Sequence, residues 1–127
     1  MTDRNVELVR RGWDAAGRGD LDAVGRLLAP DVRWHGAGDD HSGCHTRAEA
    51  LQFIREALAA GVRVELVEAR EVGDGRVLAL LQRIDDGQND SAERRPPHGE
   101  IVTVRDGRIV EMVVYPTADE AIAAATV

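Results

Sequence analysis

Glu100 is the residue best placed for chemistry, because it begins a segment whose other residues on the same side are apolar. Val102 and Val104 share its parity in an expected strand over residues 100–105. A carboxyl group on a buried face is costly unless it is paired, so it tends to hold its proton at a raised pKa or to serve a function. Such a group suits a general acid, a general base or a hydrogen-bond donor to a ligand. The simpler alternative leaves Glu100 in water at the strand rim, or paired with an Arg.

Two histidines are candidates for handling a proton. His98 shares the parity of Glu100, which would place the two side chains next to each other at the mouth of a pocket. It also follows two prolines in a long loop, where a solvated histidine is the simpler interpretation. His35 alternates with Trp34, so we predict that it lies on the opposite face, at a surface or interface. If a β-bulge reverses that alternation, His35 becomes the best general base in the chain.

A cluster of possible metal ligands lies in a polar segment. His41, Cys44 and His45 follow Asp39 and Asp40, and these are acceptable ligand types. Zinc requires at least three converging ligands, however, and adjacent side chains point apart in an extended loop. We therefore expect no metal and no other cofactor.

Helices must position these candidate residues from one side. Apolar residues recur at helical spacing in residues 5–18, 21–28 and 46–60. The second and third helices begin after the N-cap residues Asp20 and Thr46, and Thr117 precedes a short Ala-rich C-terminal helix.

Strands supply the other side. A period of two predicts strands at residues 31–36, 62–72, 76–83, 100–105 and 108–115, with tight turns at residues 73–75 and 106–107. Residues 36–45 and 85–99 are expected to be polar loops. Helices followed by a run of strands indicate an α+β fold with the helices on one face of a bent sheet. We expect a cone-shaped architecture, in which a curved mixed or antiparallel sheet wraps around three N-terminal helices and leaves a hollow for a ligand.

Composition restricts the class of protein. A chain of 127 residues fits a single domain over residues 1–127. A net charge of −7 argues against a nucleic-acid partner. We expect no membrane partner and a cytoplasmic location, because the sequence has neither an apolar run of membrane-spanning length nor a leader. One cysteine cannot form an internal disulfide, which also suits a reducing compartment.

Four strings carry a family resemblance: Gly-Asp-Leu-Asp at residues 19–22, Pro-Asp-Val-Arg-Trp-His-Gly at 30–36, Thr-Arg-Ala-Glu-Ala at 46–50 and Asp-Gly-Arg-Ile-Val-Glu-Met at 106–112. In order and spacing they resemble the nuclear-transport-factor-two-like superfamily, in its SnoaL-like and ketosteroid-isomerase-like branch. The resemblance covers almost the whole chain and implies the cone fold and a homodimer through the outer sheet face. It implies no single activity, because that fold hosts isomerases, cyclases, hydrolases, dehydratases and non-catalytic proteins.

The resemblance also indicates which functional groups are present. In ketosteroid isomerases a strand Asp is the base, and a helix Tyr and a protonated strand Asp hold the oxyanion. Matching the strings places Gly12 at the Tyr position and Gly36 at the base position, and only Glu100 keeps an acid. Steroid isomerisation by that mechanism is therefore not expected. Phe53 and Met112 match positions that line the cavity in these relatives.

The candidate ligand-binding residues are Trp13, Trp34, Phe53, His98 and Met112. For Trp13, on the stripe of the first helix, a core position is the simpler interpretation. We expect a SnoaL-like domain that binds a small apolar molecule, with Glu100 and His35 as the catalytic candidates. It would transfer a proton on an apolar or cyclic metabolite, as an isomerase, cyclase or hydrolase does.

The alternative is a non-catalytic module for ligand binding or dimerisation. Two ionisable side chains within hydrogen-bond reach of each other in the pocket would favour the enzyme. A collapsed or purely apolar pocket would favour the module.

Overall fold

The computed structural model of the protein describes residues 3–84 and 97–126, without the side chains of Asp3 and residues 39–42. In chain order the elements are α1 (Asp3–Gly17), α2 (Leu21–Leu27), β1 (Leu28–Gly36), β2 (Asp39–Cys44), α3 (Arg47–Ala59), β3 (Val64–Gly73), β4 (Arg76–Arg83), β5 (His98–Arg105), β6 (Arg108–Tyr115) and α4 (Ala118–Thr126). Most of the loop expected at residues 85–99 lies outside the described residues. Its last part is not loop, because β5 already begins at His98.

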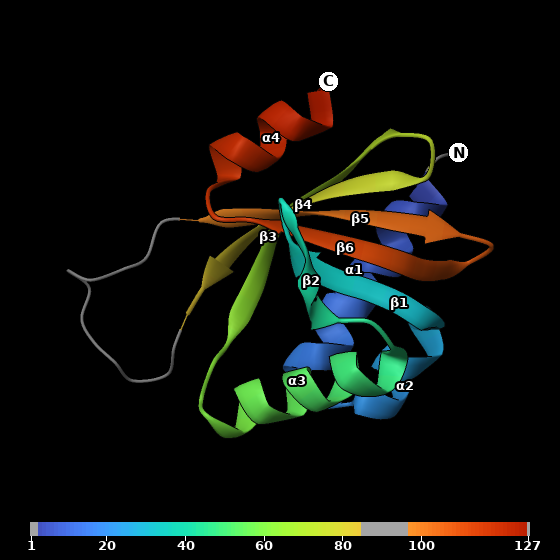
Figure 1. Ribbon diagram of the computed structural model, residues 1–127, viewed down its shortest axis with the longest axis vertical. Helices are drawn as coiled ribbons and strands as arrows, with labels where there is room; N and C mark the ends of the chain where they lie inside the picture. Colours follow the sequence, from blue (N-terminus) through green and yellow to red (C-terminus); the bar gives the residue numbers. More distant parts are fainter. Residues whose placement is uncertain (1–2, 85–96, 127) are drawn as a thin grey trace.

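The strands form one sheet with the order β2-β1-β6-β5-β4-β3. Neighbouring strands are antiparallel except for β1 and β6, which pair in parallel. The sheet curves over α1, α2 and α3 (Figure 1). The expected α+β cone fold, with a curved mixed sheet around three N-terminal helices, is therefore confirmed.

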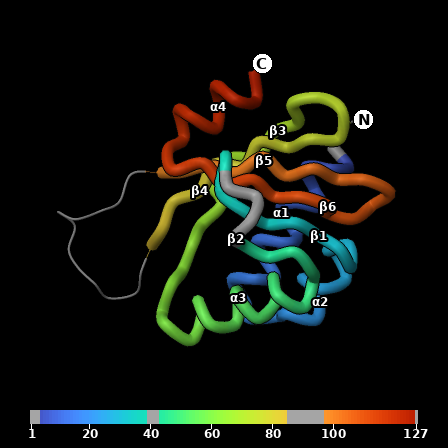
Figure 2. The backbone as a smooth tube through the Cα atoms, viewed as in Figure 1, coloured from blue at the N-terminus to red at the C-terminus, as the bar shows by residue number. Residues whose placement is uncertain are grey.

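The two faces of the sheet are covered by different helices. The larger core lies on the concave face, where Val9 of α1 and Val24 of α2 pack with Val77 and Val102 of the sheet. On the other face, Ala121 of α4 packs with Leu78 and Ile101, and Figure 2 shows α4 on the side of the sheet away from α1–α3. The prediction that the helices share one face therefore holds only for α1–α3.

The segment expected to be a polar loop at residues 36–45 contains strand β2. It pairs with β1 in an antiparallel hairpin that matches Trp34 with Cys44. Gly38 makes the turn with a φ of 80°, a conformation that side chains disfavour. A Cβ atom at Gly43 would lie 2.5 Å from the Trp34 carbonyl oxygen, so only glycine allows this approach. The pairing satisfies backbone groups that β1 would otherwise expose as an edge strand, although few residues in the segment favour strands.

The predicted N-caps are confirmed and fix the helices that face the sheet. The side chain of Asp20 accepts a hydrogen bond from the backbone N–H of Ala23 (3.2 Å), and Thr46 accepts one from Glu49 (3.1 Å). The carboxylate of Glu49 reaches back to the backbone N–H of His45 (2.7 Å). These bonds set the start of α3, which carries Phe53 and Ile54 toward the sheet.

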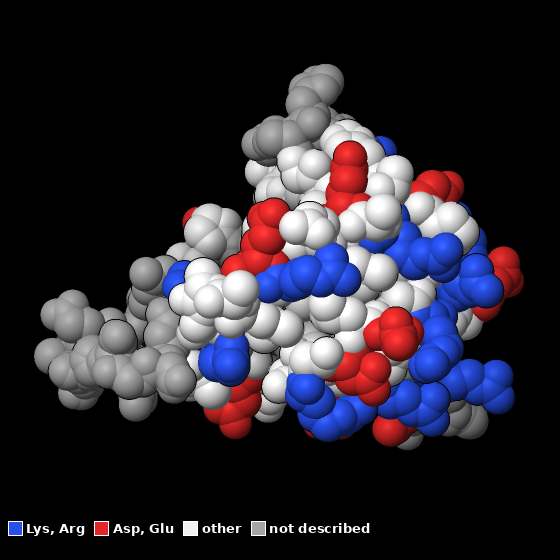
Figure 3. All heavy atoms as spheres, turned by 90° about the horizontal axis from the view of Figure 1, so that it is seen from below, with Lys and Arg blue, Asp and Glu red and all other residues white. Residues whose placement is uncertain are grey.

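The surface carries both signs of charge. Acidic and basic side chains lie interspersed on the face shown in Figure 3. Within residues 3–84 and 97–126, no helix combines the length and hydropathy needed to span a bilayer.

Candidate functional site

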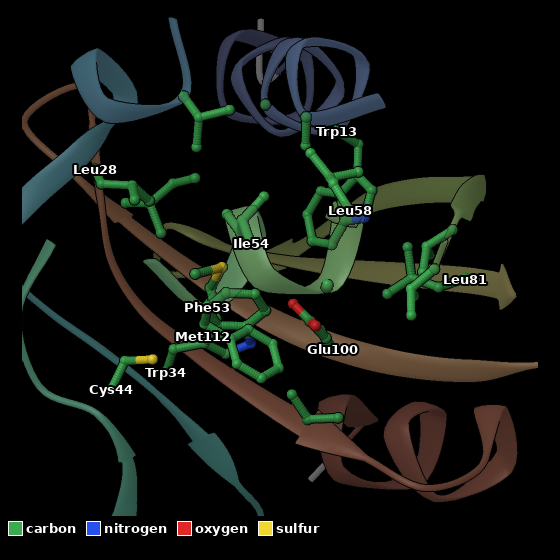
Figure 4. A pocket seen from close by; sticks show the side chains of 18 of the residues that line it. Trp13, Leu28, Trp34, Cys44, Phe53, Ile54, Leu58, Leu81, Glu100 and Met112 are labelled. Carbon is green, nitrogen blue, oxygen red and sulfur yellow. The ribbon is translucent and has the colours of Figure 1, made fainter. Parts of the chain in front are cut away.

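A cavity of about 550 Å³ lies between helices α1–α3 and the concave face of the sheet. This volume is in the usual range for small-molecule sites, roughly 300–1,000 Å³. Its wall is mostly apolar, and Figure 4 shows side chains from helices and strands converging on one space. The larger apolar residues in the wall include Trp13, Leu28, Trp34, Phe53, Ile54, Leu58, Leu81 and Met112.

The carboxyl group of Glu100 lies in this wall. The residue is only 4% exposed, and in Figure 4 its oxygens project into the space between Trp34 and Leu81. Burial raises the pKa of Glu100 to about 7, and a hydrogen bond from the Trp34 side chain partly opposes the rise. Among the described residues, its Oε1 atom is buried without a hydrogen-bond partner. The alternatives of a solvated rim position or pairing with an Arg therefore do not hold.

His98 lies on the same wall as Glu100. In the pairing of β4 with β5, His98 is opposite Leu81 and Glu100 is opposite Ala79, so the strand geometry persists through His98. Burial, and secondly the positive charge of Arg83, lower the pKa of His98. The imidazole is therefore neutral at neutral pH and keeps one N–H donor. In the described part of the chain, no hydrogen bond joins Glu100 to a second ionisable side chain.

His35 also borders the cavity, but its imidazole is hydrogen-bonded to a different carboxylate, that of Glu111. Its Nε2 atom lies 2.8 Å from Oε2 of Glu111, on the neighbouring strand β6. That hydrogen bond is the main reason why the pKa of His35 is raised. The pairing of β1 with β6 matches Trp34 with Met112 and His35 with Val113, so the alternation continues unbroken at this point. A bulge is present between β1 and β2, but it does not bring the imidazole to Glu100, and this geometry gives no support for His35 as the base.

The five candidate ligand-binding residues all border the cavity. The rings of Trp34 and Phe53 meet edge to face, with centroids 5.1 Å apart and planes at 84°, an arrangement favourable for aromatic pairs. Phe53 remains 53% exposed, whereas Met112 is 5% exposed. Trp13 also packs against the main core, so this residue is both part of the core and part of the cavity wall.

Positions matched to the family's functional residues lie together. Gly12, Gly36 and Glu100 all border the cavity. A Cβ atom at Gly36 would meet nothing within 4 Å, and one at Gly12 would make an ordinary contact of 3.7 Å with Leu27. Packing therefore does not impose glycine at the two positions that lack a functional group.

Two further polar residues border the cavity that sequence reasoning did not single out, Arg63 and Arg83, and Cys44, considered above as a metal ligand, borders it as well. Arg83 shares the parity of Leu81, a signal that would have placed it on the cavity side. Burial is the main reason why the pKa of the Cys44 thiol is raised. No three metal-binding side chains converge among those described, and the side chain of His41, from the cluster weighed as a metal site, lies outside them.

Solved structures with this fold come from several bacteria. A candidate ketosteroid isomerase from Kribbella flavida superimposes with a TM-score of 0.74 at 17% identity, covering 90% of this chain and 78% of that one. A candidate polyketide cyclase from Sinorhizobium meliloti gives a TM-score of 0.69 at 20% identity, covering 85% and 93%. An NTF2-like protein of unknown function from Burkholderia pseudomallei gives 0.69 at 27% identity over the whole of both chains.

Sequence comparison identifies the family. No curated protein shows significant similarity to the chain. The family model for the SnoaL-like domain matches residues 9–112, which is most of the 127 residues. The chain therefore belongs to the SnoaL-like family, in the nuclear-transport-factor-two-like superfamily that its sequence strings resemble.

Proposed function

We propose that the protein binds a small apolar or cyclic molecule in the cavity and that Glu100 transfers a proton to or from it. One observation carries the proposal: a buried carboxyl group with an unpartnered oxygen faces an otherwise largely apolar space. With a pKa of about 7, this group populates both its acid and its carboxylate forms at neutral pH, which suits general acid–base catalysis.

The chemistry follows from the groups on the wall. The carboxylate of Glu100 removes a proton from a carbon next to a substrate carbonyl, and the electron pair of that C–H bond moves onto the carbonyl oxygen. The neutral His98, on the same wall, supplies an N–H donor for that oxygen. Return of the proton from Glu100 to another carbon completes an isomerisation, and attack of the enolate on a second carbonyl would close a ring. The relatives described as a candidate isomerase and a candidate cyclase support this reaction class.

The second candidate is a non-catalytic ligand-binding module. Two observations favour it. Gly12 and Gly36 lie on the cavity wall, at the positions where the family resemblance places a Tyr and the catalytic Asp, and among the described residues no second ionisable side chain is hydrogen-bonded to Glu100. In this alternative, Glu100 only donates a hydrogen bond to the ligand.

One experiment separates the two functions. Thermal-shift screening of cyclic and aromatic carbonyl compounds identifies ligands for the wild type and for Glu100→Gln, and each ligand is then incubated in D₂O and followed by NMR. We expect the wild type to exchange the acidic C–H of a bound ligand at least about a hundredfold faster than Glu100→Gln. Glu111→Gln is the matched control, because it makes the same change on the outer side of the sheet, and it should exchange at the wild-type rate. Ligands that bind both proteins equally and are exchanged by neither would eliminate the catalytic proposal and leave the module.

A further inference from the structure

The side chain of Trp34 connects strand β1 to the carboxyl group of Glu100 on β5. Gly36 of β1 is opposite Val114 of β6, and Val114 is opposite Glu100, so strand β6 separates the two. Because neighbouring strands lie about 4.8 Å apart, the backbones of β1 and β5 are roughly 10 Å from each other. The long indole group reaches across this gap, since it hydrogen-bonds to Glu100.

This hydrogen bond gives the two carboxyl oxygens of Glu100 different surroundings. An indole has a single N–H donor and no acceptor. Within the described part of the chain, Oε1 of Glu100 is buried without a hydrogen-bond partner, so the indole N–H of Trp34 donates to Oε2. Rotation of the carboxyl group would break that bond. Oε1 is therefore held free on the side of the cavity, into which the Glu100 oxygens project in Figure 4.

The indole is itself held by three neighbouring elements. The ring of Phe53 from α3 meets it edge to face, with centroids 5.1 Å apart. The backbone of Trp34 pairs with Cys44 of β2 on one side and with Met112 of β6 on the other. A donor whose ring and backbone are both fixed by packing and pairing is preorganised for its acceptor.

The hydrogen bond also acts on the charge of Glu100. The other ionisable side chains described on the cavity wall are His35, Cys44, Arg63, Arg83 and His98. The pKa of Glu100 is set by burial, which raises it, and by the bond from Trp34, which lowers it. An N–H donor stabilises the carboxylate relative to the neutral acid. Without this donor, burial would act alone and Glu100 would keep its proton at neutral pH.

We infer that Trp34 is a positioning residue for the proposed proton transfer, because its indole N–H binds Oε2 of Glu100, stabilises the carboxylate and leaves Oε1 to exchange the proton with the ligand. The inference rests on the proposed function and adds a residue to its machinery. The ring of Trp34 also contributes apolar surface to the cavity. Trp34→Phe retains an aromatic ring there and removes only the donor.

The first measurement needs no ligand. In protein labelled with ¹⁵N, the two tryptophans give two indole N–H signals in NMR spectra, and Trp34→Phe identifies the signal of Trp34. We expect this signal to shift with a midpoint near pH 7, where Glu100 titrates, and to lose that midpoint in Glu100→Gln. The signal of Trp13 is the internal control and should not follow Glu100.

The second measurement compares variants. The ¹³C signal of the Glu100 carboxyl carbon, identified by its absence from Glu100→Gln, gives the pKa of this group. We expect Trp34→Phe to raise that pKa by about one to two pH units, because the carboxylate loses a hydrogen bond, whereas the control Trp13→Phe should not raise it. The pH at which deuterium exchange of a bound ligand is half-maximal should rise by the same amount in Trp34→Phe.

The outcomes distinguish this inference from the proposed function. A Trp34 signal that does not respond to Glu100, or an equal pKa of Glu100 in the wild type and Trp34→Phe, would overturn the inference. A raised pKa in Trp34→Phe without Glu100-dependent exchange of any ligand would retain Trp34 as the residue that holds Glu100 and reject proton transfer. Thermal melting verifies that each variant is folded. If Trp34→Phe does not fold, Trp13→Phe identifies the two signals and the first measurement decides alone.

Discussion

Glu100 and His35 were both candidates for proton transfer, and their surroundings separate them. Glu100 is buried with the Trp34 side chain as its hydrogen-bond partner, whereas His35 has a carboxylate partner in Glu111 at 2.8 Å. An ionised Glu100 is disfavoured, and a protonated His35 is favoured. The carboxyl group of Glu100 can therefore gain or lose a proton near neutral pH, whereas the imidazole of His35 is held in a hydrogen-bonded pair with Glu111.

Replacing Glu100 should change how the stability of the protein depends on pH. The pKa of this carboxyl group is about 7 in the folded protein, against 4.5 as its ordinary value. Well below pH 4.5 the carboxyl group is protonated in both the folded and the unfolded state, so its ionisation does not lower the free energy of unfolding. As the pH rises from 4.5 through 7, the unfolded chain ionises first, so the wild type loses about 3 kcal/mol of unfolding free energy. Glu100→Gln should not show this loss in urea unfolding at pH 5 and pH 8.

His35 provides an internal control for this measurement. Its raised pKa also contributes stability that is present below its ordinary value of 6.5 and lost as the pH rises through the folded pKa. The wild type and Glu100→Gln both retain His35. The difference between their unfolding free energies as a function of pH is therefore due to Glu100 alone. Identical profiles would show that Glu100 is not buried in solution.

The sequence identified Glu100 but not the arginines, for a physical reason. Val102 and Val104 reveal the buried side of β5, so parity alone places Glu100 on the cavity wall. Arg63 directly precedes β3, where an arginine is normally solvated, and only the pairing of β3 with β4 places its backbone next to that of Ile84. Single-strand periodicity carries no information about that pairing.

At the scale of the elements, α4 packs closely against the sheet. Helix α4 packs mainly over β5, where Gly99 provides the space for Ala121. A Cβ atom at Gly99 would lie 2.5 Å from the Cβ atom of Ala121 and 3.3 Å from Leu80. The close packing of α4 on β5 therefore requires a glycine at position 99.

Gly99→Ala should displace α4 and destabilise the protein. We expect a loss of about 1–3 kcal/mol of unfolding free energy, typical of overpacking, measured by urea unfolding. Gly36→Ala is the matched control, because a Cβ atom there meets nothing within 4 Å. If both variants had equal stability, the close packing of α4 on β5 would be refuted.

The strands with clear alternation were predicted with accurate ends, and β2 was not predicted at all. Strands β4 and β6 match the predicted bounds, since both consist largely of aliphatic residues bordered by Asp-Gly turns. Strand β2 has the sequence Asp-Asp-His-Ser-Gly-Cys, which contains no β-branched or aromatic residue. It forms a strand because β1 provides a backbone edge to pair with, and such tertiary effects override local propensity.

At the scale of the whole molecule, α4 limits where a second copy could bind. The homodimer expected from the family resemblance would use the outer sheet face, and α4 contacts β4, β5 and β6 on that face. The region beside β1 and β6, around the His35–Glu111 pair and Val113, is left for a partner.

We therefore expect a dimer that a single charge at Val113 disrupts. Analytical ultracentrifugation should give about twice the chain mass of 13.8 kDa for the wild type and one chain mass for Val113→Glu, because a buried unpaired carboxylate is costly. Val67→Glu, at a residue on β3 that is 60% exposed, should remain dimeric. A wild type that sediments as 13.8 kDa would refute the expected dimer.

The chain contains two tryptophans, and both Trp13 and Trp34 border the cavity. All indole fluorescence of the protein therefore originates from the wall of the site. A ligand that binds in the cavity changes the environment of Trp13 and Trp34. Its binding should therefore change the tryptophan emission spectrum without any attached dye. Since the side chain of Trp34 also hydrogen-bonds to Glu100, the same light signal responds to the proton on that carboxyl group.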